Sequence, residues 1–348
     1  MAVGLPTKAN WAAGDILTAA QMDDLAGTVN LLQYSAFPIM AGKNAIINGG
    51  MDIWQRGTNS FSIAATTAQY TTDRWTCYFG GTGTITQETS VIPSNSKYAL
   101  RMTATATSVG NIIYQIIETN NVLPYAGKAI TLSFQLAGTV GISLNATLAY
   151  STSVDDSLFN VSTSIALTTV TSPTLSNSLQ TYVFTGTIPS TAKTLRVGIG
   201  TGAVVNTNYL VIANVQLELG STATTFSRAG GSIGGELALC QRYYYQIGGT
   251  SANLQDAGNG HYYTTTAAYI TTIFPVTMRT SPTCAAVNIA NWSIFSAGSG
   301  RACTAFAAST PSPYNATSNF TTAIATLGLG GWLEQTNANA ALTFSAEL

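Results

Sequence analysis

Charged residues are scarce in this 348-residue sequence: they make up 8% of it, against roughly a quarter in ordinary soluble proteins. Acidic and basic side chains nearly balance, and no block of Lys or Arg occurs. The electrostatic footprint of a protein that binds nucleic acid or anionic lipid is therefore missing. No run of about 18 apolar residues is present, so we expect no membrane insertion. Residues 1–17 lack the basic and apolar segments of a secretory signal.

Residues that carry catalytic chemistry are also few. The sequence has one histidine, His261, and no GxSxG motif, which argues against a nucleophilic triad. No spaced acidic pair stands out for glycoside hydrolysis, although Asp155 with a second acid stays open. Asp52 and Asp73 have two interpretations, either buried ion pairs and backbone caps or a structural calcium site. We expect no enzyme and no cofactor beyond that calcium. Four cysteines without a CxxC spacing are expected to be buried free thiols: Cys77, Cys240, Cys284 and Cys303.

Thr, Ser, Asn and Gly are abundant, and they accompany short stretches with a period of two. Residues 98–103, 130–136 and 194–199 alternate between apolar and polar or small side chains, as half-buried strands do. Residues 209–219 alternate as well, and we expect Val211, Ala213, Val215, Leu217 and Leu219 to share the core face. Short strands broken by Gly, Pro and Asn predict a mainly β protein whose body is a jelly-roll sandwich of about eight strands.

The first 40 residues have a different pattern. Residues 18–21 form a capping box, and an apolar stripe with helical spacing follows it, which predicts a helix. An isolated helix of this length is marginal in water, so it needs a partner, either the β-structure of its own chain or another protein. We divide the chain into a helical attachment segment (1–40), a jelly-roll sandwich (41–228), and a linker helix with a distal β-sandwich (229–348). The stripe comprises Met22, Leu25, Val29 and Leu32.

Several phrases in the sequence resemble those of a known family. They are NGGMDIWQRG (48–57), YTTDRW (70–75), QLE (216–218), ELALCQRYY (236–244), MRTSPT (278–283) and the terminal SAEL (345–348). Together they resemble bacteriophage tail-fibre and virion appendage proteins with a body like a carbohydrate-binding module and a C-terminal trimeric β-domain. A further phrase, GDILTAA (14–20), resembles the opening of other phage appendage proteins, so the phrases touch all three sections of the chain.

This resemblance implies a structural protein of the virion that is assembled in the bacterial host cytoplasm. It implies a homotrimer, attachment to other virion proteins through residues 1–40, and adhesion to a host glycan or outer-membrane protein. The alternative is a head fibre, capsid decoration or baseplate connector with a purely structural role. Neither reading involves nucleic acid.

The segments between the family phrases are the expected place for receptor contact, because loops carry binding on a rigid scaffold. Aromatic rings cover the apolar face of a sugar while amides and carboxylates bond its hydroxyl groups. Trp54 and Trp75 lie in strand-like phrases and are expected in the core, whereas Trp332 is open to either role. The candidate ligand-binding residues are Asp256, His261, Tyr262, Tyr263 and Tyr314.

Overall fold

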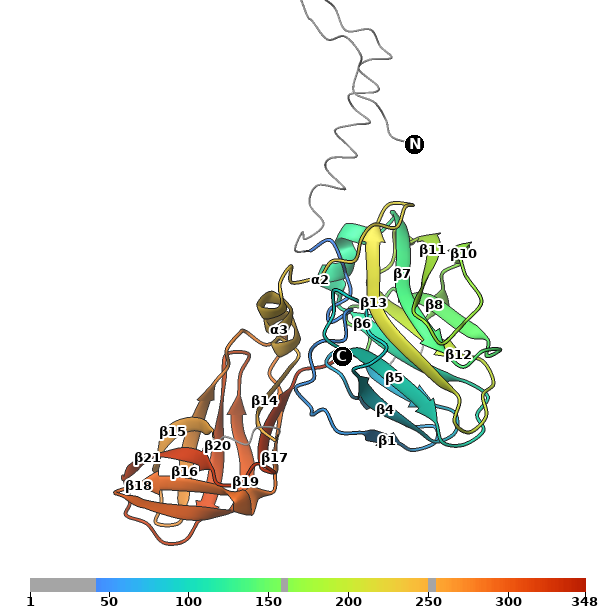
Figure 1. Cartoon of the computed structure of the whole chain (residues 1–348). Helices are drawn as coiled ribbons and strands as arrows, with labels where there is room; N and C mark the ends of the chain where they lie inside the picture. The colour runs from blue at the N-terminus through green and yellow to red at the C-terminus, as the bar shows by residue number, and fades with distance from the viewer. Residues whose placement is uncertain (1–41, 158–161, 250–254) are drawn as a thin grey trace, which may run out of the picture.

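The computed structural model describes residues 42–157, 162–249 and 255–348 (Figure 1). The expected attachment helix with Met22, Leu25, Val29 and Leu32 lies outside these residues. Nearly every described element is a strand, so the mainly β class is confirmed. No helix among the described residues is long and apolar enough to cross a membrane.

Two antiparallel sheets form the body of the protein, which we call the sandwich. The first sheet has the order β1-β4-β5-β13-β7-β11-β10 and the second has the order β2-β3-β6-β12-β8-β9. The first comprises β1 (Phe61–Ile63), β4 (Gly83–Glu88), β5 (Ala99–Ala104), β13 (Tyr209–Leu219), β7 (Ala129–Gly138), β11 (Gln180–Thr187) and β10 (Thr168–Thr171). The second comprises β2 (Ala68–Tyr70), β3 (Thr76–Phe79), β6 (Asn111–Ile117), β12 (Thr194–Thr201), β8 (Leu144–Ser151) and β9 (Thr163–Ser164). A short helix α2 (Thr119–Val122) and a 3-10 turn η1 (Leu123–Tyr125) follow β6.

Alternating side chains place the core between the two sheets. On β12, Leu195, Val197 and Ile199 are fully buried in the main apolar cluster, as the period of two predicts. Trp54 and Trp75 also belong to this cluster, which confirms that they are core residues. The jelly-roll-like sandwich expected for this part of the chain is therefore confirmed, whereas the domain boundaries stay a prediction.

Strand β13 corrects one detail of the sequence interpretation. Ile212 and Val215 both point into the main core, whereas Val211 and Ala213 pack in a small cluster on the other face. The pairing of β13 with β7 shifts register between Ala213 and Gln216, and Asn214 has a left-handed φ of 50°. Such a bulge adds one residue and reverses the alternation, so the expected single core face was wrong.

The C-terminal section has its own core, and Figure 1 shows it beside the sandwich with the helix α3 (Ile233–Gln241) between them. The prediction of a distal sandwich was wrong, because six strands close into a barrel here. In a closed barrel every strand has a neighbour on both sides, so no sheet edge is left with unpaired backbone N–H and C=O groups. A three-stranded sheet accompanies it. The barrel strands are β15 (Asp256–Tyr262), β16 (Ala267–Ile273), β18 (Trp292–Ser296), β19 (Ser299–Pro311), β20 (Asn315–Thr322) and β21 (Gly330–Gln335). The small sheet comprises β14 (Tyr244–Gly248), β22 (Ala341–Ser345) and β17 (Thr283–Val287), and the turn η2 (Ile289–Asn291) precedes β18.

Candidate functional site

Except for residues 216–218, the family phrases among the described residues meet at one place, the buried contact between the sandwich and the C-terminal section, which we call the joint. Helix α3 contributes Cys240 and the residue Tyr243 follows it; both pack against Ile47 and Ile53 of the sandwich. Glu236 in the first turn of the helix accepts hydrogen bonds from the backbone N–H groups of Asn48 and Gly230. The phrases therefore contact one another although they are far apart in the sequence.

Glu347 is the centre of the joint. Its carboxylate pairs with Arg74 and, at 3.0 Å, with Arg56, and all three side chains are largely buried. The Arg74 guanidinium lies 3.6 Å from the ring centre of Tyr243, and the Arg56 guanidinium lies 3.6 Å from that of Tyr244. Burial alone would lower the pKa of Arg74, but the Glu347 carboxylate outweighs it and leaves the pKa above its ordinary value. The Arg74 guanidinium therefore stays charged.

The acids considered for calcium are already occupied by nitrogen donors. Asp73 accepts hydrogen bonds from the backbone and side-chain N–H groups of Gln55 at 2.6 and 2.7 Å. Asp52 pairs with Arg228 at 2.6 Å and accepts from the backbone N–H of Lys97. Among the described residues, no group of three or more His, Cys, Asp or Glu is arranged to hold a metal. These side chains fit ion pairs and backbone caps, and they do not fit a cation.

Two further ion pairs extend the joint. Arg242 pairs with Glu118 at 3.1 Å, and Arg279 lies 3.5 Å from Asp155. Arg279 also donates to the backbone carbonyl of Ala346 at 2.8 Å. The loop acid Asp155 is therefore engaged across the joint, and this contact gives it a structural role. All four cysteines are free thiols, as expected; three of them are buried, whereas Cys284 on β17 is only half-buried.

The candidate site lies on the outward face of the second sheet, next to the joint. The central strand β12 presents Arg196, Gly198 and Gly200 outward. A Cβ on Gly200 would overlap the carbonyl oxygen of Asn111, and one on Gly198 would lie 2.5 Å from Oγ1 of Thr147. At Gly200 the backbone of β6 leaves no room for a side chain, and at Gly198 the side chains of Thr147 and Ile112 already fill the space that a Cβ would take. Residues of β3, β6 and β8 on this face line a depression, which we call the trough.

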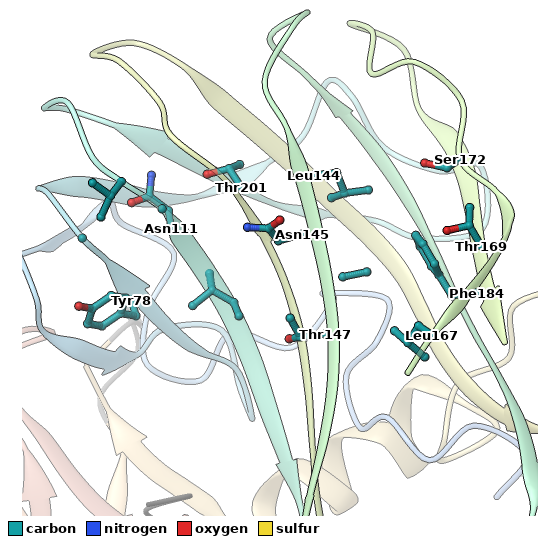
Figure 2. A pocket seen from close by; sticks show the side chains of 15 residues that line it. Tyr78, Asn111, Leu144, Asn145, Thr147, Leu167, Thr169, Ser172, Phe184 and Thr201 are labelled. Atoms are coloured by element: carbon teal, nitrogen blue, oxygen red, sulfur yellow. The ribbon is translucent and has the colours of Figure 1, made fainter. Parts of the chain in front are cut away.

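The two walls of the trough differ in chemistry. On one side, Ile112 of β6 pairs with Gly200 and with Tyr78 of β3, which makes an apolar wall. On the other side, Asn145 and Thr147 of β8 pair with Gly200 and Gly198, which makes an exposed wall of amide and hydroxyl groups. The depression has a volume of about 650 Å³. Figure 2 shows Tyr78 at one end of the lining and Phe184 at the other, with Asn145 between them.

A cation lies on the same sheet between the trough and the joint. The Arg196 guanidinium lies 5.6 Å from the ring centre of Tyr114, which pairs with Gly198 across β6 and β12. Burial raises the pKa of Tyr114, although Arg196 opposes this effect, so the ring keeps its proton at neutral pH. Farther along the same strands, Ile116 and Ala149 pack against Leu348.

The depression also continues around β8 into a second, more apolar part. Leu144 points away from Asn145, toward Leu167 and Phe184 (Figure 2). No carboxylate and no histidine lies among the residues that line the depression. Hydrolysis of a glycosidic bond normally needs a pair of carboxyl groups. The trough can therefore hold a ligand by stacking and hydrogen bonding, and it lacks the groups for acid–base catalysis.

The structure does not bring the sequence-based ligand candidates together. Asp256 and His261 are exposed on β15, which is a barrel strand and not the expected loop tip. Tyr263 is half-buried and stacks on Tyr269 at 4.0 Å. Tyr262 is fully buried, and its hydroxyl bonds Thr322 at the end of β20.

Tyr262 was therefore wrong as a ligand contact: strand alternation turns it into the barrel core while its neighbours face outward. Tyr314 is 65% exposed, but it precedes the first residue of β20 and so lies at the other end of the barrel from Tyr262. The trough was missed by sequence reasoning. The signal was present, since Arg196, Gly198 and Gly200 alternate with the apolar residues of β12.

No protein-family model matches this sequence, and no curated protein matches it. Among solved structures, the enzymatically active domain of tailspike protein 4 of bacteriophage CBA120 is 12% identical, with a TM-score of 0.33. That match covers 51% of this chain and 21% of the tailspike chain. A C-terminal family 22 carbohydrate binding module of Clostridium thermocellum is 17% identical over 43% of this chain and 88% of that one, with a TM-score of 0.31.

A putative sugar binding protein from Bacteroides thetaiotaomicron is 9% identical over 51% of this chain and 100% of that one, with a TM-score of 0.34. This chain thus spans about a fifth of the length of the tailspike chain that it matches. At such identities and scores, function has to be argued from the residues of the chain itself.

Proposed function

We propose that this chain is a structural protein of a bacteriophage virion, a tail fibre or similar appendage, that adheres to the host by binding surface polysaccharide. The trough is the observation that carries the binding part of the proposal. Its lining offers the aromatic ring of Tyr78 on one strand and the amide and hydroxyl groups of Asn145 and Thr147 on another. The family phrases of the sequence support the virion part.

A sugar ring matches this division of chemistry. The apolar face of a pyranose packs on an aromatic ring such as Tyr78, and its hydroxyl groups exchange hydrogen bonds with side chains such as Asn145. The lining without carboxylates favours binding over cleavage, so we propose a protein that is not an enzyme.

The proposed assembly is a homotrimer that is attached to other virion proteins through residues 1–40 and carried out of the host cytoplasm on the particle. Three troughs per trimer would give avidity although each site is weak. A head fibre, capsid decoration or baseplate connector would share the fold but would not need the trough to bind anything.

The test of binding is affinity electrophoresis of the full-length protein in gels that contain xylan, β-glucan, galactan or dextran. We expect at least one polysaccharide to slow the protein. Tyr78→Ala and Asn145→Ala should weaken this effect about tenfold, since each removes a contact worth about 1.4 kcal/mol. Tyr209→Ala is the matched control, because Tyr209 is, like Tyr78, a half-buried tyrosine. It lies on the first sheet, away from the trough, and its ring stacks on Arg101.

Wild-type mobility of both trough variants in a gel that slows the wild type would contradict glycan binding by the trough. The virion part has its own test, since deletion of residues 1–40 from the phage genome should remove the protein from assembled particles. Normal incorporation of the shortened protein would argue against attachment through this segment.

A further inference from the structure

The outer wall of the barrel carries an aromatic pair that the joint and the trough leave unexplained. Trp332 of β21 is 40% exposed, and Phe295 of β18 stacks on it with 5.7 Å between ring centres and 16° between planes. The two residues are direct partners in the strand register. Trp332 is the one exposed tryptophan among the described residues, because Trp54, Trp75 and Trp292 are buried.

The surroundings of the pair leave room for a ligand and fix the tryptophan. The indole N–H donates to Glu334 at 3.1 Å, which holds the ring in place. Next to Trp332 on the outward face stands Gly330, where an added Cβ would meet nothing closer than 3.8 Å. Asn259 of β15 is exposed and pairs directly with Trp332. A flat apolar ring therefore has an open flank on one side and an amide on another. We call this surface the Trp332 platform.

The charge around the platform has one sign. Glu334 pairs in the register with Asp256, which is exposed, so two carboxylates lie side by side next to the aromatic pair. The arginines of the C-terminal section that follow β14, Arg279 and Arg301, are bound elsewhere, at the backbone of residues 346 and 347 and at Ser296. Carboxylates repel anionic saccharides and accept hydrogen bonds from hydroxyl groups.

From this arrangement we propose that the Trp332 platform is a second saccharide-binding surface, one that takes neutral hexopyranoses and rejects anionic ones. The apolar face of the sugar stacks on Trp332, and its hydroxyl groups bond Asn259 and Glu334. This surface does not depend on the trough being a glycan site, because it lies on a different sheet with a different core.

A glycan microarray probed with the full-length protein tests this proposal. Trp332→Ala should reduce the signal on neutral hexose-terminated glycans at least tenfold, and Trp332→Phe should keep part of it. Ile273→Ala, which removes another exposed apolar side chain of the C-terminal section, should change nothing. Tyr78→Ala separates the two surfaces, because loss of signal with this variant alone would support the trough and overturn the platform.

Two outcomes on the array would overturn the proposal directly. One is an unchanged signal for Trp332→Ala, and the other is wild-type binding to sialylated, phosphorylated or uronate glycans only. An array with no wild-type signal at all would also reject it.

Light scattering and fluorescence provide independent readouts. If Trp332→Ala converts an oligomer into monomers, the platform is a subunit contact and the proposal fails. Trp11 lies outside the described residues, so the fluorescence experiment uses a Trp11→Phe background. Acrylamide should then quench mainly the fluorescence of Trp332, because the other tryptophans are buried. The neutral glycan that gives the strongest array signal should reduce this quenching. Unchanged quenching at a saturating glycan concentration would reject stacking on this ring.

Discussion

The joint and the two outward surfaces of this protein use similar residues in opposite ways. At the joint, arginines, tyrosines and a carboxylate are buried and bound to one another, as Arg74 is to Glu347 and Tyr243. On the trough and the Trp332 platform, tyrosine, tryptophan and amide side chains stay partly or fully exposed to solvent. The recognisable phrases of the sequence lie at the joint. These phrases therefore contain residues that hold the fold together. We expect the ligand contacts in the segments outside them.

The strongest way to break this comparison is to remove the carboxylate of the joint. Glu347→Gln leaves Arg74 buried without a counter-charge and Arg56 with Asp73 alone, 3.8 Å away. This should lower the free energy of unfolding by about 3–5 kcal/mol. Urea denaturation measures it. The control is Glu334→Gln on the platform, where a partly exposed carboxylate is replaced and a change within about 0.5 kcal/mol is expected. Equal losses in the two variants would contradict the contrast between joint and surface.

Two neighbouring tyrosines, the last residue of β15 and the residue after it, test the boundary between core and surface. Tyr262→Ala should cost about 3 kcal/mol or slightly more, because it opens a cavity in the barrel core and leaves Thr322 without one partner. Tyr263→Ala should cost about 1 kcal/mol, since it removes a stacked pair on the wall. Thermal melts of both variants provide the comparison. A larger loss for Tyr263 would place the core face of β15 on the other side.

The pH dependence of stability sharpens the description of the joint. Burial is the largest influence on Asp73 and raises its pKa from the ordinary 3.8 to about 6, against the pull of Arg56 and Gln55. A raised pKa means that the folded state holds the proton more tightly than the unfolded state. This contribution to stability is fully present below about pH 4 and is lost as the pH rises through 6.

The measurement is the difference in unfolding free energy between wild type and Asp73→Asn at several pH values. The free energy of unfolding of the wild type minus that of the variant should fall by about 2–3 kcal/mol from pH 4 to pH 7. A difference that stays flat over this range would mean that Asp73 is ionised throughout and that its hydrogen bonds outweigh burial.

The smallest effect is expected in the trough. Asn145→Ala and Thr147→Ala replace exposed side chains, so each should change the free energy of unfolding by no more than about 0.5 kcal/mol. Thermal melts made beside the affinity gels provide this comparison. A loss of several kcal/mol would identify these residues as part of the fold and would remove the main argument for a binding surface.

Local patterns made much of the fold predictable. The alternation in residues 209–219 predicts a strand with the bounds that β13 has, and the apolar face of β12 is also as expected. The bulge at Asn214 was not predictable, because its cause is the pairing with β7 and not the sequence of β13 itself. The glycines and small polar residues of 256–263 indicated a loop, yet pairing with β16 and β21 holds them in a strand.

The sites were less predictable than the fold because they depend on partners that are remote in sequence. Glu347 pairs with Arg74, which is 273 residues away in the sequence. No periodic pattern in the sequence predicts such a contact. The trough likewise assembles residues of β3, β6, β8 and β12, each ordinary in its own segment. Outward glycines on a buried strand are the one local signal that would have pointed to it.

The position of Glu347 in the sequence also sets an order of events during synthesis. Arg56 and Arg74 leave the ribosome long before their counter-charge, so the sandwich must fold while both guanidinium groups are still hydrated. Closing a loop of this length is slow compared with pairing neighbouring strands. We therefore expect the joint to form last on the folding pathway and to open first under denaturing conditions, as a separate kinetic phase.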